Sequence, residues 1–481
     1  MMLRNRVFTL QITALTPLHI GTGTRLAADL DYYADGATTY MLDSDVALEL
    51  ALQRWEADRL SPDEQRRQAE AALDEDAARL LRRRERNVRE IEAFPTSPPQ
   101  DRRKLLQWEQ QQEKLRSEAG EVRAAMAQLK ARRAALANQV FADSAGLPDA
   151  LVGGSGFADL LKTDLLTLAD IRARADVGGR PLVRYALDGR PAAGEIFEQI
   201  KDVADHMYLP GSSLKGAIRS ALAWDLAPNR AARELMALTG GGEKTADNKI
   251  EEQIFLGREL RRMNAMNATV RDVMRTLHVA DSAPLAATPE LLSVAIFRSA
   301  SQRNARLAVE AIPAGAALRA TLQVERYPFE SAEARKVLEF GDWQARLAPE
   351  ALAAACRRRA EALIAGEQAY FARFPEAAEL VRFYKDLRDT LTALEPRSFV
   401  LPVGWGAGWR SKTLDDRLRG EGDADAPFVE AVRRFKLKKH KSPGFEPGGS
   451  FPDTRKLAMA GERPARPLGW LQVAISEERQ R

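Results

Sequence analysis

Residues 210–222, PGSSLKGAIRSAL, combine side chains and backbone groups that suit a phosphate. Ser212 or Ser213 can cap a helix that begins here. Lys215 and Arg219 lie four positions apart, so both project from one side of that helix. Free backbone N–H groups, the positive end of the helix dipole, a hydroxyl and two cations would then meet in one place. The segment predicts an anion-binding site, although an ordinary capped helix with a surface lysine explains the same residues.

Residues 404–413, GWGAGWRSKT, alternate glycines with two tryptophans and end in two cations. Glycines let a loop approach another backbone closely, indoles stack on bases and cations neutralise phosphates, so the pattern is typical of a clamp for single-stranded RNA. The alternative is a glycine-rich turn whose tryptophans pack on the core. We expect at least one indole to be structural, because tryptophans are usually mostly buried. The candidates for RNA contact are Gly404, Trp405, Gly406, Gly408, Trp409, Arg410 and Lys412.

A third segment, TPLHIGTG at residues 16–23, places His19 beside Gly21 and Gly23. Its proline and glycines predict that the preceding strand ends here in a loop. The imidazole of His19 could act as a general acid or base, or bond to bases through its ring nitrogens. A histidine in such a place is more often a structural group whose hydrogen bonds are satisfied, and that interpretation has the greater weight.

The densest basic run is RRFKLKKHK at residues 433–441. Its cations could neutralise phosphates and make binding salt-dependent, but a solvated charged face explains the run equally well. The whole chain of 481 residues carries 72 Lys and Arg against 68 Asp and Glu, a formal charge of only +4. Any affinity for RNA must therefore come from local clusters of cations and not from the overall charge.

The cysteine and histidine content excludes several kinds of site. A single cysteine, Cys356, leaves no internal disulfide framework and no cysteine-based zinc site. The four histidines are scattered without metal-ligand spacing, so we expect no metal and no other cofactor. The N-terminus alternates apolar and polar residues, unlike a signal peptide, and no run of about 18 apolar residues occurs. We therefore expect a soluble cytoplasmic protein without membrane contact.

The elements that would position these motifs are mixed strands and helices. Residues 8–14 alternate apolar and polar side chains, which predicts a half-buried strand. Residues 306–325 repeat that alternation around a Pro-Ala-Gly turn, which predicts a β-hairpin. This order favours the α+β class. The other expected elements are short strands at 276–282 and 294–299, a mostly helical segment at 329–395, a short helix near 427–435 and a closing strand at 468–476.

Residues 61–140 have a different composition, rich in Arg, Glu, Ala and Leu. Ser61 and Pro62 form a good helix start, and the helical composition breaks at PTSPPQ before it resumes. From residue 105 to 136, apolar positions follow a three-four alternation that predicts a heptad seam. The pattern predicts an antiparallel helical hairpin, inserted into the chain, whose charged remainder is a solvated face.

Together and in this order, these motifs resemble the RAMP superfamily of CRISPR proteins. TPLHIGTG, YLPGSSLKGAIRSAL and GWGAGWRSKT look like motifs of that superfamily, and PGSSLKGA is the most specific of them. FPDTRKL at residues 451–457 and PLGWLQV at 467–473 look like the family of the fifth subunit of the type III-A Csm effector complex. The resemblance covers both ends and the middle of the chain.

The resemblance implies ferredoxin-like (RRM-like) RAMP modules whose glycine-rich loops bind CRISPR RNA. One domain would cover residues 1–325 with the helical insertion at 45–142, and a second would cover 326–481. The implied role is to cap the 3′ end of the guide, contact the backbone subunits of the Csm complex and assist maturation, with a maturation nuclease as a further partner. The helical insertion departs from a compact family member, and docking of a protein is favoured over RNA contact as its role. Outside the 404–412 set, the RNA-binding candidates are His19, Gly21, Gly23, Ser212, Ser213, Lys215 and Arg219.

A RAMP-type ribonuclease or backbone subunit that cleaves RNA is the alternative, since relatives use a histidine-centred site or a loop aspartate. His19 would need a partner that lets a ribose 2′-hydroxyl attack, and no local feature supplies one. Asp29, Asp31 and Asp35 lie in an early loop where a metal-assisted aspartate could act, although such residues are usually only solvated. We expect no enzymatic activity. A coiled-coil scaffold without an RNA role explains residues 61–140 but none of the glycine loops.

Overall fold

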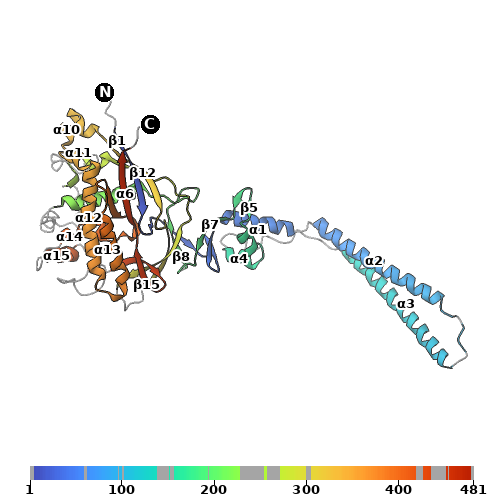
Figure 1. The fold of residues 1–481 in the computed structure, drawn as a ribbon. Coiled ribbons are helices and arrows are strands. Elements are labelled where there is room, and N and C mark those ends of the chain that lie inside the picture. Colours follow the sequence, from blue (N-terminus) through green and yellow to red (C-terminus); the bar gives the residue numbers. More distant parts are fainter. Residues whose placement is uncertain are drawn as a thin grey trace. The chain divides into compact units, whose positions relative to one another are not determined.

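The chain forms two compact units in the computed structural model (Figure 1). Unit 1 comprises Met1–Asp43 and Pro181–Arg481, and unit 2 is the intervening Ser44–Arg180. In the described ranges no helix is long and apolar enough to cross a membrane. The structure describes residues 5–58, 62–95, 97–99, 102–137, 151, 156–192, 194–227, 254–256, 271–298, 305–418, 426–434, 451–452 and 454–477.

The first sheet of unit 1 is antiparallel and has five strands within the described residues. Strands β1 and β12 lie side by side at its centre, from Arg6 opposite Val324 to Thr13 opposite Ala317 (Figure 1). In spatial order the strands are β13 (Ser398–Pro402), β16 (Trp470–Glu477), β1 (Arg6–Ala14), β12 (Ala317–Val324) and β9 (Leu277–Val279).

The alternating apolar residues of β1 determine which face of this sheet packs against helices. Phe8, Leu10, Ile12 and Ala14 are all buried and share one face of the strand, because alternate residues of a strand point the same way. They belong to the same apolar core as residues of two helices, α6 (Gly211–Leu226) and α12 (Pro349–Phe371). The helix α6 carries the first predicted motif, so the sheet core fixes the position of that motif.

The second sheet of unit 1 has six strands in the described ranges, and only β8 and β11 run parallel. Its spatial order is β15 (Arg463–Pro467), β14 (Arg455–Ala460), β10 (Glu290–Phe297), β11 (Arg306–Ala311), β8 (Glu195–Gln199) and β2 (Gly21–Ala27). A smaller sheet contains β3 (Tyr32–Asp35), β4 (Thr38–Leu42) and β7 (Val183–Asp188).

The predicted hairpin at residues 306–325 is wrong, although both of its strands exist. β11 pairs with β10 and β8, whereas β12 pairs with β1 and β9, so the two strands enter different sheets. The connection is held at β1, since Gly315 donates its amide to the carbonyl of Ala14 and Ala14 donates to that of Ala316. Eight paired positions between β1 and β12 replace the local pairing that the turn residues suggested.

Most other predicted elements are confirmed. β1 and β16 match the strands expected at 8–14 and 468–476, and β9 falls within 276–282. β10 (Glu290–Phe297) overlaps the strand expected at 294–299 but begins four residues earlier. The helix expected near 427–435 is α15 (Ala426–Arg434), while residues 435–441 of the basic run lie outside the described residues. The helical segment expected at 329–395 corresponds to α9 (Tyr327–Glu330), which begins two residues earlier, and to α10 (Ala332–Leu338), α11 (Trp343–Arg346), α12 and α13 (Ala378–Thr392).

The expected domain boundary between residues 325 and 326 does not separate the strands of either large sheet into two domains. β1 pairs with β16, and β10 pairs with β14, so each large sheet contains strands from both sides of that boundary. The chain is mixed α and β, and its sheets are predominantly antiparallel.

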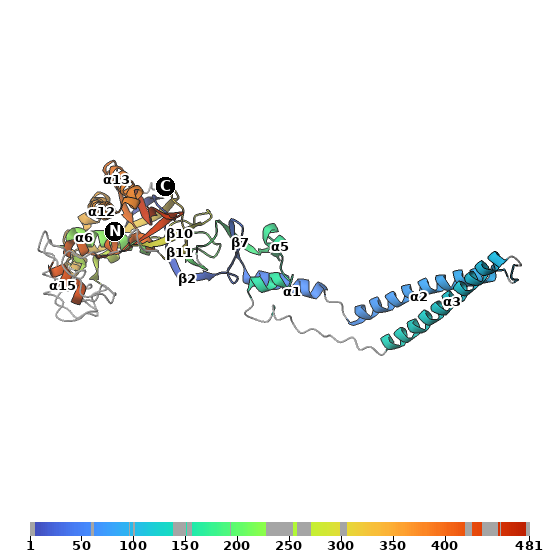
Figure 2. The ribbon, with the colours of Figure 1, turned by 90° about the horizontal axis from the view of Figure 1, so that it is seen from below.

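Unit 2 is dominated by two long helices, α2 (Pro62–Glu92) and α3 (Arg102–Ala137), which run side by side (Figure 2). They are antiparallel, since the Asn87 amide donates to the carbonyl of Leu115 while Arg132 binds Asp76. Of the predicted seam, Leu115, Val122 and Leu129 are buried. The unit also contains the helices α1 (Ser44–Asp58), α4 (Phe157–Lys162) and α5 (Leu168–Ala173) and most of the strand pair β5 (Asp176–Val177) and β6 (Arg180–Pro181).

Candidate nucleic-acid interface

Parts of all three predicted motifs line two adjoining hollows in unit 1. Ser213, Gly404 and Lys412 line both, so segments far apart in the sequence meet at one place. The first, the hydroxyl hollow, has a volume of about 330 Å³ and is also lined by Ser212, Gly216, Ala217, Ser220, Pro402, Val403 and Ser411. The second, the aromatic hollow, has a volume of about 430 Å³ and is also lined by His19, Ile20, Gly21, Gly23, Thr24, Arg25, Phe197, Glu198 and Trp405.

The start of α6 brings two serines to the hydroxyl hollow. The predicted serine cap is wrong, because the helix begins at Gly211 and Pro210 precedes it without a side-chain cap. The Asp281 carboxylate accepts a 2.7 Å hydrogen bond from the Gly211 amide instead, and a negative charge there complements the helix dipole. A Cβ at Gly211 would lie 2.0 Å from the carbonyl oxygen of Val279, so only glycine fits. Ser212 and Ser213 therefore belong to the first turn.

The two cations of that motif lie on another side of α6, outside the lining of both hollows. Arg219 forms a 2.7 Å ion pair with Asp272, and its guanidinium lies 4.0 Å from the Phe255 ring. Burial lowers the pKa of Lys215, and the charges of Arg219 and Arg275 contribute, although Asp272 opposes them. The expected meeting of serine hydroxyls with Lys215 and Arg219 does not occur. Lys412 is the cation that joins the serines.

The glycines of the 404–413 loop permit the close approach that the sequence predicted. Gly404 has φ of +86°, and a Cβ there would lie 2.5 Å from the carbonyl oxygen of His19. The next residue, Trp405, donates its amide to that same carbonyl at 2.9 Å. At Gly406 a Cβ would lie 2.3 Å from Cβ of Leu468. The loop is therefore held between the segment that contains His19 and Leu468, which lies between β15 and β16.

The segment at residues 16–23 is only partly a loop, because Gly21 already begins β2. The preceding strand does end here, since β1 stops at Ala14, but the prediction that Gly21 and Gly23 belong to the loop is wrong, because both lie in β2. β2 pairs with β8 at Gly21 and again from Arg25 to Ala27, with an irregularity between them. Gly23, with φ of +95°, lies in that irregularity, and the exposed strand start forms one wall of the aromatic hollow.

The two tryptophans of the loop differ in their surroundings. The half-buried Trp405 ring packs edge-on against His19 and lies 5.7 Å from the Phe197 ring. The Lys456 ammonium lies 3.6 Å from the centre of the same indole. Trp409 is 36% exposed. Trp405 therefore meets the expectation that one indole is structural, and it still lines the aromatic hollow.

His19 is buried, and its ring is held by the backbone of β11. Its Nδ1 lies 2.6 Å from the carbonyl oxygen of Glu310, which can only accept, so Nδ1 donates. Burial lowers the pKa of His19 to about 4, although the bond to Glu310 opposes the shift and Lys456 and Lys201 add to it. The imidazole is therefore neutral at pH 7.

The comparisons with known proteins place these motifs in a family. A family model described as the RAMP superfamily matches residues 11–354. The chain belongs to the RAMP superfamily. No curated protein matches the sequence. A chain of a cryo-EM structure of a Csm–crRNA–target RNA ternary complex from a type III-A CRISPR-Cas system is similar in fold, with a TM-score of 0.53 and 20% identity over 97% of this chain and 100% of that one.

A buried carboxylate, Glu310, supports the aromatic hollow of this RAMP protein. Its side chain accepts hydrogen bonds from the Tyr185 hydroxyl at 2.7 Å, the Lys201 ammonium at 2.6 Å and the Gln199 amide at 3.1 Å. The Gln199 side chain in turn accepts from the amide of Ile20 at 2.9 Å. Glu310 also accepts the bond from His19 through its backbone carbonyl. It therefore holds in place both His19 and, through Gln199, Ile20, which line the aromatic hollow.

The sequence reasoning missed Glu310, Lys201 and Tyr185. The one available signal was a lone carboxylate in the apolar run LAVEAI of β11, because a charge at a buried strand position needs partners. Those partners come from β7, the end of β8 and the loop after it, and the sequence alone did not connect them to β11.

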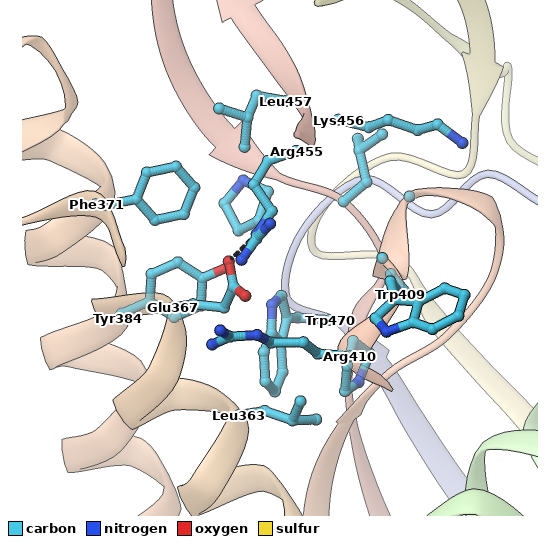
Figure 3. Close-up of a pocket in the computed structure, with 16 residues that line it drawn as sticks. Leu363, Glu367, Phe371, Tyr384, Trp409, Arg410, Arg455, Lys456, Leu457 and Trp470 are labelled. Atoms are coloured by element: carbon cyan, nitrogen blue, oxygen red, sulfur yellow. Dashed lines mark hydrogen bonds and ion pairs between the residues drawn. The ribbon is translucent and has the colours of Figure 1, made fainter. Parts of the chain in front are cut away.

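Arg410 points away from the two hollows of the RAMP chain. Figure 3 shows its side chain extending toward Glu367 on α12, while the Trp409 ring points elsewhere. Arg455 forms a 2.6 Å bond to Glu367 in the same region. The Arg410 carbonyl accepts a hydrogen bond from Arg359, so both ends of the residue hold the loop to α12.

The early aspartates have structural positions in the turn between β2 and β3. The Asp31 carboxylate accepts a 2.7 Å bond from the Ala27 amide, and Asp29 adopts φ of 63°. Neither they nor Asp35 line the hydroxyl or aromatic hollow. Within the described ranges, no three His, Cys, Asp or Glu side chains gather as a metal site would require.

Proposed function

We propose that this RAMP chain is a CRISPR RNA-binding subunit of a type III-A effector complex and that the guide binds in the hydroxyl and aromatic hollows. The observation that carries the proposal is the convergence of Ser213, Gly404 and Lys412 on both hollows. A phosphate beside Lys412 would have hydroxyls on one side and aromatic rings on the other. That is the arrangement one nucleotide of a single strand requires.

The electrostatics of the site favour an anion. Burial lowers the pKa of Lys456 to about 8, and the charge of the exposed Lys412 adds to the shift. Two cations that disfavour one another are stabilised by a phosphate between them. On the aromatic side, Phe197, Trp405 and the Arg25 guanidinium offer flat groups on which a base can stack.

The topology supports an RNA-binding module. In chain order β1, α6, β9, β12, α12 and β16 form a βαββαβ unit, and the strands lie in the order β16, β1, β12, β9. We infer that the first sheet is a ferredoxin-like, RRM-like module extended by β13, and that unit 2 is inserted into it. The likeness in fold to a chain of a Csm–crRNA–target RNA complex agrees with this inference.

We propose further that the chain caps the 3′ end of the guide, contacts neighbouring Csm subunits and assists maturation while a separate nuclease trims the RNA. A binding role without catalysis fits the groups that could have acted. His19 is neutral and bonded through Nδ1, and Asp31 is bonded to the Ala27 amide. These bonds give both residues a structural role that requires no catalysis.

The experiment is to sequence the 3′ ends of guides recovered from a co-expressed complex. With Lys412→Ala, we expect the guide ends to become heterogeneous or the subunit to be lost from the complex. Lys385→Ala, which removes an exposed lysine from α13, is the matched control and is expected to leave both unchanged. Uniform guide ends and full occupancy with Lys412→Ala would contradict the proposal.

A further inference from the structure

One exposed side of α2 carries a stripe of four arginines. Arg79, Arg82, Arg86 and Arg89 are all exposed, and their spacing of three, four and three residues places them on one side of the helix. The stripe is about 15 Å long at about 1.5 Å per residue. Arg82, Arg86 and Arg89 also line a shallow hollow of about 420 Å³, together with Glu85, Glu90 and Ala93.

These arginines differ from those that join the two helices. Arg83 binds Glu118 at 3.4 Å and Glu121 at 2.8 Å on α3, and Arg132 and Arg133 of α3 bind Asp76 and Asp74. In the stripe, by contrast, Arg89 approaches only Glu85, at 3.9 Å. Among the residues that the structure describes, Arg79, Arg82 and Arg86 form no ion pair. The four arginines of the stripe therefore form none of these ion pairs between α2 and α3.

The charge is concentrated at one end of the hairpin. Residues 79–92 of α2 contain six Arg and three Glu, whereas residues 62–78 contain two Arg and six Asp or Glu. On α3, residues 102–117 contain five Lys or Arg and two Glu. Both helices are thus basic in the halves beside the turn at 93–101, in a chain that is nearly neutral overall.

We infer that the arginine stripe of α2, defined by Arg79, Arg82, Arg86 and Arg89, is a second RNA-binding surface, separate from the hollows of unit 1, that binds the phosphates of a single strand. Guanidinium groups bind phosphate oxygens through two parallel hydrogen bonds, which a lysine ammonium does not form in the same way. All four cations of the stripe are arginines. The large exposed apolar residues of α2, Leu81, Val88 and Ile91, lie on a different side of the helix. A protein interface would need such residues at its centre, so the stripe favours a nucleic acid.

The test uses the full chain and a polyuridine of about 20 nucleotides, with affinity measured by fluorescence anisotropy between roughly 50 and 200 mM salt. The stripe variant replaces all four arginines by Gln, which is a good helix former and so preserves α2. The slope of log affinity against log salt is expected to fall by about 0.7 for each phosphate that the variant no longer neutralises. The matched control replaces Arg66, Arg67, Arg123 and Lys130, exposed cations in the other halves of α2 and α3, and is expected to change the slope by less than a third as much.

The outcomes separate this inference from the proposed function. A stripe variant that binds RNA with the control's slope overturns the inference, whatever Lys412→Ala does. A reduced slope in the stripe variant supports it even if Lys412→Ala has no effect, in which case the proposal for the hollows fails. Stripe-dependent binding of poly-glutamate as tight as that of RNA would identify an acidic-protein surface and overturn the inference.

Discussion

The amide of Trp405 donates a 2.9 Å hydrogen bond to the carbonyl of His19, which joins the two glycine-containing loops of this RAMP protein. That bond forms directly beside Gly404, whose missing side chain leaves room for the His19 carbonyl. The aromatic hollow exists because the two loops are held at this distance. The first prediction concerns the residue that permits this close approach.

Gly404→Ala should lower the free energy of unfolding by about 1–3 kcal/mol, since the position has positive φ and a Cβ would clash with a backbone oxygen. Urea unfolding of the full chain measures the change. Gly216→Ala is the control, because a Cβ there meets nothing within 4 Å and alanine favours the helix. Equal stabilities of the two variants would show that the approach of the two loops is not constrained.

Lys412→Ala should weaken binding of single-stranded RNA and reduce the salt slope by about 0.7, the value for one neutralised phosphate. The same titration of Lys385→Ala, which removes one exposed charge from α13, should match the unaltered protein. If the salt slope of RNA binding were the same for Lys412→Ala as for Lys385→Ala, Lys412 would not contact a phosphate.

Glu310→Gln should be more destabilising than Tyr185→Phe, because it leaves the buried Lys201 ammonium with a much weaker partner. Breaking a buried ion pair costs about 3–5 kcal/mol, whereas the loss of one hydrogen bond costs about 1–2 kcal/mol. Urea unfolding gives both values. RNA affinity should fall in both variants under conditions where they remain folded, and full affinity in both would show that Glu310 does not position the site.

His19 should make the fold sensitive to mild acid. Its pKa is about 4 in the folded chain against 6.5 for an ordinary histidine, so the unfolded chain binds the proton more readily. The stabilisation is present above pH 6.5 and is lost as the pH falls toward 4, by about 3 kcal/mol in total. The free energy of unfolding of His19→Gln should fall less between pH 7 and about pH 4.5 than that of the unaltered protein. If the free energy of unfolding depended on pH equally in His19→Gln and in the unaltered protein, the burial of a neutral imidazole at His19 would be contradicted.

Guide and target RNA should stay intact when incubated with the purified chain and divalent metal. Asp31 is bonded to the Ala27 amide and lies outside the two hollows. Gel analysis over several hours is the measurement. Metal-dependent cutting that Asp31→Ala abolishes would establish the ribonuclease alternative.

Local patterns predicted the strands well but not their partners. The alternation in β1 and β12 identified both strands, because a half-buried strand must alternate. The turn after β11 suggested a hairpin, yet the pairing went to β1, more than 290 positions earlier in the chain. Such long-range pairing depends on the whole core and leaves no trace in a short window.

The candidate site was predicted at the level of motifs and less well at the level of side chains. The sequence identified Ser213, Gly404 and Lys412, which do meet. Helical spacing correctly placed Lys215 and Arg219 on one side, but their orientation depended on Asp272, whose position the sequence could not give. Glu310 was missed for a similar reason, since its partners lie on other elements.

Ultraviolet crosslinking of the co-expressed complex, with crosslinked positions mapped on both guide and protein, tests the central claim most directly. We predict crosslinks from residues 404–412 and from the start of β2 to the 3′ end of the guide. Crosslinks from these residues spread along the whole guide would indicate a backbone subunit, and their absence in an intact complex would contradict RNA binding in the hollows.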